Sequence, residues 1–252
     1  MDDRFLRIER LLGIEAVQRL HDSMVTVVGL GAVGGYVVEG LARAGVGHLR
    51  LVDFDWVRRH NINRQIIALE STVGMKKTDC LADRVAGINP NCRIEIFDLF
   101  ADRDTIPHIL HPMPDLLVDA IDSMNPKIEL LAMASEQNIP VISSMGAALR
   151  TDPSRVKISD IFKTRKCPLA KRLRKKLRQR GVQAKIPCVY SDEDIDFQYR
   201  DAELEKPDQG PVPEFERGRP RLVLGSLPTI TGIFGLTLAN MAIGMLSGVE
   251  KK

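Results

Sequence analysis

The stretch MVTVVGLGAVGGYVVEGLARAGVGHLRLVDFDWVRRHNINRQ, residues 24–65, decides the fold class of this chain. A β-branched run over 25–28 leads directly into a turn that contains Gly29, Gly31 and Gly34, and a segment with helical spacing follows. A second apolar run ends at Asp53, which comes 19 residues after Gly34. This order of strand, glycine-rich turn, helix, strand and acid is typical of the nucleotide-binding half of a doubly wound sheet.

The glycine-rich turn and the acid are suited to bind a nucleotide. Glycines permit a tight turn, and they let backbone N–H groups approach a phosphate at the positive end of the following helix. The carboxylate of Asp53 stands where it can accept hydrogen bonds from ribose hydroxyls. These features alone would also suit NAD, so an NAD-dependent oxidoreductase is one alternative.

Charged residues after Asp53 favour ATP over NAD. Arg64 can form forked hydrogen bonds to a triphosphate, and Lys77, beside Lys76 at the start of the next helix, can balance it as a point charge. Asp122 follows the fourth apolar run at the carboxyl edge of the sheet. There it can hold Mg²⁺ against the phosphates or, alternatively, cap the next helix. The pattern therefore predicts ATP and Mg²⁺ as ligands.

The rest of the chain alternates between strand and helix patterns. This alternation predicts a Rossmann-like, doubly wound α/β fold with a mainly parallel sheet and helices on both faces. Strands are expected near 24–29, 48–53, 93–98, 115–120 and 140–144, and helices near 5–22 (broken at Gly13), 33–44, 75–89, 102–111 and 126–138. A basic helix, a proline- and acid-rich loop over 186–221 and a C-terminal helix complete the expectation.

Length and composition fit a soluble globular protein. We expect one domain of 252 residues, in which 1–150 form the ATP-binding core and 151–252 serve substrate binding and dimerisation. The contents of 44% hydrophobic and 27% charged residues are ordinary for a globular protein, and the charged residues 1–4 are unlike a secretory signal. The four cysteines are widely spaced without a CxxC pair, which supports neither a disulfide framework nor a zinc site. A cytoplasmic location is the simplest expectation.

A strongly basic segment covers residues 163–180, with ten Lys or Arg and no acid. Leu169, Leu173 and Leu177 recur at four-residue spacing, so the segment is expected to be an amphipathic helix with one apolar stripe. Its unbroken positive charge indicates a polyanion, and the absence of interleaved aromatic residues favours structured RNA over a single strand. An anionic membrane surface is the alternative, and no DNA partner is expected. The candidate RNA contacts are Lys171, Arg172, Arg174, Lys175 and Arg178.

Residues 222–246 contain no charge and are long enough to span a bilayer. Several glycines, Pro228 and Asn240 make the segment a poor membrane span. We therefore expect a loop followed by a buried helix that packs on the sheet or at a dimer interface, with no stable membrane insertion.

Five motifs, at 29–34, 53–55, 61–65, 74–77 and 119–122, resemble in order and spacing the E1-like adenylating superfamily over roughly residues 4–150. The resemblance implies ribose binding by Asp53, phosphate binding by Asn61, Arg64 and Lys77, and magnesium binding by Asp122. It also implies a homodimer in which Arg7 reaches into the ATP site of the partner subunit. The implied nucleotide-binding set is Gly29, Gly31, Gly34, Asp53, Asp55, Asn61, Arg64, Lys77 and Asp122, and the implied catalytic set is Arg7, Arg64, Lys77 and Asp122.

Further segments, at 160–170, 188–191 and 225–232, resemble one branch of that superfamily, the tRNA threonylcarbamoyladenosine dehydratases. The resemblance implies that ATP activates the side-chain carboxylate of threonylcarbamoyladenosine, next to the anticodon of a tRNA. The acyl-adenylate then cyclises, with net loss of water.

Some members of the branch have a cysteine shortly before the C-terminal helix, whereas residues 219–226 here contain none. Because that cysteine is missing, direct cyclisation without a covalent enzyme intermediate is favoured. Cys188 is the only cysteine in a motif-like position. The alternative activity is adenylation of the C-terminus of a ubiquitin-like or sulfur-carrier protein. A cysteine desulfurase or sulfur acceptor is a further candidate partner.

Overall fold

The computed structural model describes residues 3–195 and 223–249. Seven strands form one sheet in the order β3-β2-β1-β4-β5-β7-β6, and only β6 runs antiparallel to its neighbour. The strands are β1 Met24–Val28, β2 His48–Val52, β3 Arg93–Phe97, β4 Leu116–Asp119, β5 Val141–Ser144, β6 Val156–Asp160 and β7 Pro187–Ser191. The predicted doubly wound, mainly parallel fold is confirmed.

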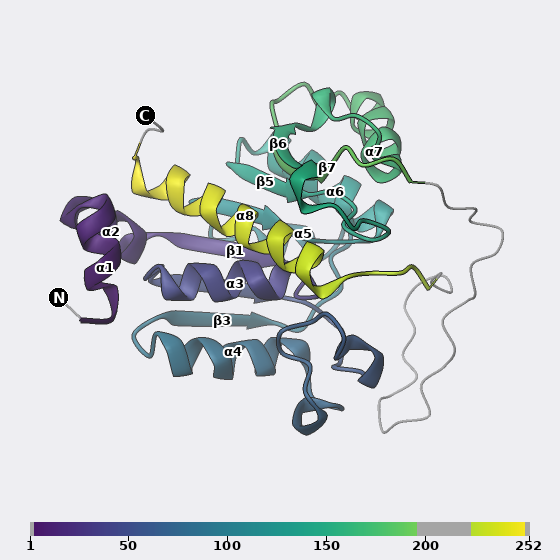
Figure 1. The fold of residues 1–252 in the computed structure, drawn as a ribbon. Helices are drawn as coiled ribbons and strands as arrows, with labels where there is room; N and C mark the ends of the chain where they lie inside the picture. Colours follow the sequence, from purple (N-terminus) through teal and green to yellow (C-terminus); the bar gives the residue numbers. More distant parts are fainter. Residues whose placement is uncertain (1–2, 196–222, 250–252) are drawn as a thin grey trace.

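Helices cover both faces of the sheet (Figure 1). They are α1 Leu6–Leu12, α2 Ile14–Asp22, α3 Gly34–Arg43, α4 Lys77–Ile88, α5 Ile106–Ile109, α6 Met124–Glu136, α7 Pro168–Gln179 and α8 Pro228–Ser247. Alternate strand residues serve the two faces, since Val27 packs with α3, α4 and α8 whereas Val28 packs with α5, α6 and α7. Strands buried on both sides explain the continuous apolar runs in the sequence.

β1 lies at the topological switch point of the sheet. It pairs in parallel with β2 on one side and with β4 on the other. The helix that follows β1 packs on one face of the sheet, and the helix that follows β4 packs on the opposite face. Ligands of open α/β sheets bind at the carboxyl ends of the strands at such a point. The glycine-rich turn after β1, Asp53 after β2 and Asp122 after β4 all lie at this edge.

The structure corrects two details of the expected elements. The proline- and acid-rich loop was expected from residue 186, but 187–191 form β7, whose Cys188 and Val189 are fully buried beside β5. A proline is tolerated because Pro187 is the first residue of the strand. Most of the remaining expected loop, 196–222, lies outside the described residues. The helix expected over 102–111 shrinks to α5, because the side chains of Asp102 and Thr105 form a turn with each other's backbone.

α8 is the C-terminal helix expected on the sheet. It packs on α3 at very short range: a methyl group on Gly40 would come within 2.6 Å of the Cβ of Ala239. By length and composition α8 could also cross a membrane, and 44% of its most apolar window is buried within the fold. The described structure therefore uses one face of α8 as part of the core.

Candidate functional site

The glycine-rich turn joins β1 to α3 through a backbone path that only glycine permits at two positions. Gly29 has φ +89° and donates a hydrogen bond to the carbonyl of Val52 at 2.9 Å. A Cβ at Gly34 would lie 1.8 Å from the carbonyl oxygen of Gly29, which no rearrangement of side chains could relieve. Gly31 differs, since its nearest neighbour is the Nε2 of Gln65 at 3.8 Å. Gly31 thus leaves open space beside the amino end of α3, where a phosphate can approach.

Asp53 ties the glycine-rich turn to the end of β2. Its Oδ2 accepts from the N–H of Leu30 at 2.7 Å, and its Oδ1 accepts from the N–H of Asp55 at 2.8 Å. Each carboxylate oxygen has a second lone pair, so these bonds leave capacity for ribose hydroxyls. The tie to Leu30 was not expected from the sequence, and it makes the position of the turn depend on Asp53.

Lys77 is the buried cation of the site. Its Nζ lies 3.0 Å from Oδ2 of Asp55, and its backbone N–H donates to the carbonyl of Asp55 at 3.1 Å. Burial by itself would lower the pKa of Lys77, but the nearby carboxylates of Asp53, Asp55 and Asp122 raise it above its ordinary value. Lys77 is therefore charged, and the structure brings four of the predicted site residues into one cluster.

Lys76 has a different environment from Lys77. Its Nζ pairs with Asp98 at 2.9 Å, donates to the carbonyl of Phe54 and lies 4.4 Å from the centre of the Trp56 ring. The two adjacent lysines thus point to different partners. The structure places Lys77, and not Lys76, against Asp53, Asp55 and Asp122.

The turn that contains Asn61 and Arg64 is built by its own hydrogen bonds. Asn61 is buried, and its Oδ1 accepts from the N–H of Arg58 at 3.1 Å. Nη1 of Arg64 donates to the carbonyl of His60 at 3.0 Å and to Oδ1 of Asn63 at 2.8 Å. Asn61 therefore has a structural task in this turn, and the phosphate contacts of Asn61 and Arg64 remain predictions.

Asp122 is exposed just after β4, where its Oδ1 accepts from the hydroxyl of Ser123. The N-cap position of α6 belongs to Ser123, so the alternative role of Asp122 as the capping residue does not hold. Within the described residues, no group of three or more His, Cys, Asp or Glu side chains is arranged to hold a metal ion. A divalent cation at Asp122 would thus need phosphate oxygens and water as its other ligands, which is the pattern that Mg²⁺ favours.

A buried network below Asp122 was missed at the sequence level. The fully buried Nζ of Lys127 lies 2.7 Å from Oδ2 of Asp119 and donates to the carbonyl of Ile121 at 2.8 Å. The hydroxyl of Ser143 on β5 donates to the same carboxylate at 2.6 Å. A lysine inside the apolar pattern of α6 was the only signal in the sequence. The network fixes the strand end from which Asp122 projects.

Gln65 is a second residue that the sequence analysis did not single out. It is buried, and its Oε1 has no hydrogen-bond partner among the described residues. Its Nε2 is the nearest atom to the space beside Gly31. Its place in the motif at 61–65 was the available signal. An unpaired buried amide beside the glycine-rich turn is suited to contact a ligand there.

Arg7 lies far from the carboxyl edge within its own chain. It is exposed on α1, and α1 and α2 lie beyond the amino ends of the strands, opposite to the carboxyl edge (Figure 1). The structure therefore does not bring Arg7 to Lys77 of the same chain. Any role of Arg7 in catalysis requires a second copy.

α7 is the expected basic helix, with Leu173 and Leu177 fully buried and Leu169 half-buried. Four of the five candidate RNA contacts are exposed: Lys171, Arg172, Lys175 and Arg178. Arg174 is the exception, because its Nη1 donates to the carbonyl of Thr164 at 3.0 Å and to the hydroxyl of the same residue. The guanidinium of Arg178 lies over the ring of Phe162 at 5.4 Å, so an aromatic residue does neighbour the basic face.

All four cysteines are buried and free. Burial and the neighbouring Cys167 raise the pKa of Cys188 to about 12. At neutral pH the thiol of Cys188 is therefore protonated and a poor nucleophile.

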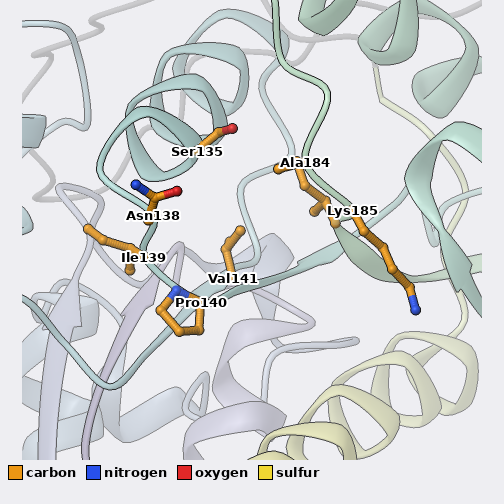
Figure 2. Close-up of a pocket in the computed structure, with 8 residues that line it drawn as sticks. Ser135, Asn138, Ile139, Pro140, Val141, Ala184 and Lys185 are labelled. Carbon is orange, nitrogen blue, oxygen red and sulfur yellow. The ribbon is translucent and has the colours of Figure 1, made fainter.

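A hollow at the other end of the sheet does not belong to this site. Figure 2 shows it between the end of α6 and the segment before β7, with Asn138, Pro140 and Lys185 among its lining residues. It opens at the amino end of β5, whereas the Lys77 cluster lies at the carboxyl ends. Lys185 is the only charged residue in its lining, so the hollow lacks the chemistry of the carboxyl edge.

Comparisons with known proteins agree with this geometry. The profile described as ThiF family matches residues 3–252. A tRNA threonylcarbamoyladenosine dehydratase of Bacillus subtilis (strain 168) is 43% identical over 190 residues, which cover 75% of each chain. The crystal structure of E. coli tRNA N6-threonylcarbamoyladenosine dehydratase, TcdA, in complex with ATP is 32% identical, with a TM-score of 0.83 over 97% of this chain and 94% of that one. A molybdopterin-synthase adenylyltransferase of Salmonella typhimurium is 34% identical over 156 residues, which cover 60% of this chain and 61% of that one.

Proposed function

The chain belongs to the ThiF family, and from this membership we propose that it is an ATP-dependent tRNA threonylcarbamoyladenosine dehydratase. The observation on which the proposal chiefly rests is the charged Lys77 among Asp53, Asp55 and Asp122, at the switch point of the sheet. The agreement with the dehydratases extends over nearly the whole chain, and the ATP complex is of such an enzyme. Activation of a carrier protein is the weaker alternative, because the adenylyltransferase matches a smaller part of this chain.

The proposed reaction has two steps at the substrate carboxylate. A carboxylate oxygen attacks the α-phosphorus of ATP, and pyrophosphate leaves. The neighbouring carbamoyl group then attacks the activated carboxyl carbon and loses a proton, AMP leaves with the carboxylate oxygen, and a ring closes. The net change in the nucleoside is the loss of one water.

The residues of the carboxyl edge have distinct tasks in this scheme. The glycine-rich turn and the amino end of α3 hold phosphate oxygens by backbone amides, and Asp53 holds the ribose. Lys77, Arg64 and Asn61 orient the phosphates, and the positive charge of Lys77 stabilises the negative charge that develops at the α-phosphate. Mg²⁺ bound through Asp122 would supply further neutralisation of the phosphate charge.

The direct test is conversion of tRNA that carries threonylcarbamoyladenosine. With ATP and Mg²⁺ the modified nucleoside should become lighter by one water in mass analysis, and NAD should not replace ATP. Asp122→Ala should remove nearly all of this turnover and its magnesium dependence, because Mg²⁺ would lose its protein ligand. The fold should survive, since the side chain of Asp122 is exposed. Unchanged nucleoside with the wild-type enzyme would refute the proposed function.

Arg7 is proposed to complete the site of a partner subunit in a homodimer. A chain with Arg7→Ala and a chain with Asp122→Ala should each be nearly inactive alone. After subunit exchange, half of the dimers hold both chains and one complete site, so about a quarter of wild-type activity should return. The rate after mixing is the measurement, with Arg10→Ala in place of Arg7→Ala as the control that needs no rescue. No gain of activity despite demonstrated exchange would remove Arg7 from the partner's site.

Cys188 is expected to have no covalent role. The Cys188→Ala enzyme should retain turnover within a few-fold of wild type, because the wild-type thiol is buried and protonated at neutral pH. The small cavity left by the change should lower stability by about 1–2 kcal/mol. Steady-state kinetics and thermal denaturation check both statements. Complete loss of turnover in a folded variant would instead indicate a thioester route.

A further inference from the structure

Arg150 is an arginine buried to 1% exposure at the edge of a cavity. The cavity measures about 330 Å³ and is lined by residues 149–151, 194–195 and 225–227. A space of this size is sufficient for part of a small-molecule or nucleotide ligand. The mechanism proposed above does not use it.

One edge of the Arg150 guanidinium is unoccupied. Nη1 donates to the carbonyl of Glu193, but Nε and Nη2 have no hydrogen-bond partner among the described residues. Nε and Nη2 form one side of the planar group, a side that can bind both oxygens of a carboxylate or phosphate. A buried cation with unpaired donors is unfavourable by itself. An anion that accepts hydrogen bonds from these donors would therefore be stabilised.

The acids near Arg150 already have other partners. The carboxylate of Glu193 accepts from the N–H and hydroxyl of Thr151 and from the N–H of Asp152. Asp194, which lines the cavity, pairs with Lys166 at 2.6 Å. These carboxylates balance charge nearby but are held by other groups. The free edge of Arg150 therefore remains for a ligand.

The start of α8 adds a second favourable feature for an anion. Ser226 and Leu227 line the cavity, and Leu227 is the N-cap residue of this 20-residue helix, without a side-chain cap. The first N–H groups of a helix carry partial positive charge. The lining of the cavity thus includes a buried arginine and the residues before the positive end of a long helix.

The segment that carries Arg150 starts at the carboxyl edge of the sheet and contacts the basic helix. The segment 145–150 leaves β5 at the same carboxyl edge as Asp122, because β5 runs parallel to β4. Its Gly146 lies against Leu169 at the start of α7, and its Leu149 donates to the carbonyl of Gly225 before α8. A substrate held by α7 and reacting beside Lys77 would pass this position.

We propose that the Arg150 cavity binds an oxyanion of the RNA substrate. This inference rests on the proposed dehydratase function and adds a residue that positions the substrate. The oxyanion is either the threonyl carboxylate of the modified adenosine or a backbone phosphate beside it. Both groups present two oxygens to the free Nε–Nη2 edge.

The test compares Arg150→Met and Arg150→Lys with wild type, using anticodon stem-loop RNA with and without the threonylcarbamoyl group. Arg150→Met should weaken RNA binding about 10- to 100-fold, as expected for loss of charge-assisted hydrogen bonds, with ATP affinity unchanged. Arg150→Lys should recover part of the loss, since it keeps the charge without the fork. The control is Arg155→Met, whose half-exposed side chain lies near Asp152 and Asp192.

The two RNAs separate the sources of the anion. A loss confined to the modified RNA assigns Arg150 to the carboxylate, and an equal loss with both RNAs assigns it to a phosphate. The melting temperature is measured beside the affinity, because Arg150→Met also removes the hydrogen bond to the carbonyl of Glu193. An unchanged ATP affinity in the same variant shows that a loss of RNA binding does not come from a loss of fold. Unchanged RNA affinity, or a loss matched by Arg155→Met, would overturn the inference. Wild-type turnover in the same preparations distinguishes this outcome from failure of the proposed function.

Discussion

Replacing Lys77 with methionine is expected to lower turnover by on the order of 10²–10³-fold, the usual effect of removing one preorganised charge from a transition state. The long apolar side chain fills the volume of the lysine stem, so the fold should survive. The carboxylates of Asp53, Asp55 and Asp122 would lose their shared cation, and ATP binding should weaken as well. Single-turnover rates of adenylate formation and ATP titration are the measurements.

Lys76→Met is the matched control for this prediction. Lys76 is the adjacent residue of the same type, but it pairs with Asp98 and lies over Trp56. Its loss should change turnover by no more than a few-fold. Equal effects of the two substitutions would mean that Lys77 has no special place at the α-phosphate.

The pH dependence of turnover should not reflect Lys77 below pH 10. The pKa of Lys77 is raised above its ordinary value of 10.5, so the charge is present throughout the neutral range. The same raised pKa determines how stability depends on pH. The ion pair of Lys77 with Asp55 stabilises the fold below the unfolded-state pKa of the lysine, and this stabilisation is lost as the pH rises through the higher folded-state pKa.

Reversal of Lys171, Arg172 and Lys175 to glutamate is expected to weaken tRNA binding by on the order of 10²-fold or more at moderate salt. All three side chains are exposed on α7 and project away from the buried Leu173 and Leu177, so the fold should be unaffected. Arg174 is left intact because it is bonded to Thr164. ATP affinity should not change, since the ATP-site residues lie on other elements.

The salt dependence of binding is the sharper measurement for α7. Each phosphate contact that is lost should make the slope of log affinity against log salt shallower by about one unit. Arg103→Glu, a reversal at an exposed arginine outside α7, is the control for a general change of charge. If affinity and slope survive the triple reversal, the basic face of α7 is only a solvated surface.

Local patterns were sufficient to predict most of the fold. The five predicted strands lie within one or two residues of β1 to β5. β1, β2, β4 and β5 are mainly apolar runs that are buried on both faces, whereas the edge strand β3 is half-exposed and was indicated by the turn residues before it and by its alternating pattern. The strands β6 and β7 were missed. β7 begins with Pro187, and it is stabilised by its pairing with β5 and by burial, neither of which is a local property.

The candidate site also contains residues that were predicted from the sequence and residues that were not. Gly29, Gly34, Asp53, Lys77 and Asp122 were predicted because they stand at fixed offsets from the strand ends, and the parallel sheet brings such positions to one edge. The buried Asp119–Lys127 pair was missed although Lys127 stands inside an apolar helical pattern, and the burial of Arg150 had no local signal, because it depends on segments far away in the sequence.

The sequence by itself determined the alternation of strands and helices, the glycine-rich turn and the residue types at the strand ends, because these depend on side-chain periodicity and on backbone sterics within a few residues. The tertiary structure decided the partner of each of two adjacent lysines, Asp55 for Lys77 and Asp98 for Lys76. It also decided that Arg150 is buried with a free edge. Each of these depends on distant segments of the chain, whose packing sets burial, charge neighbours and direction.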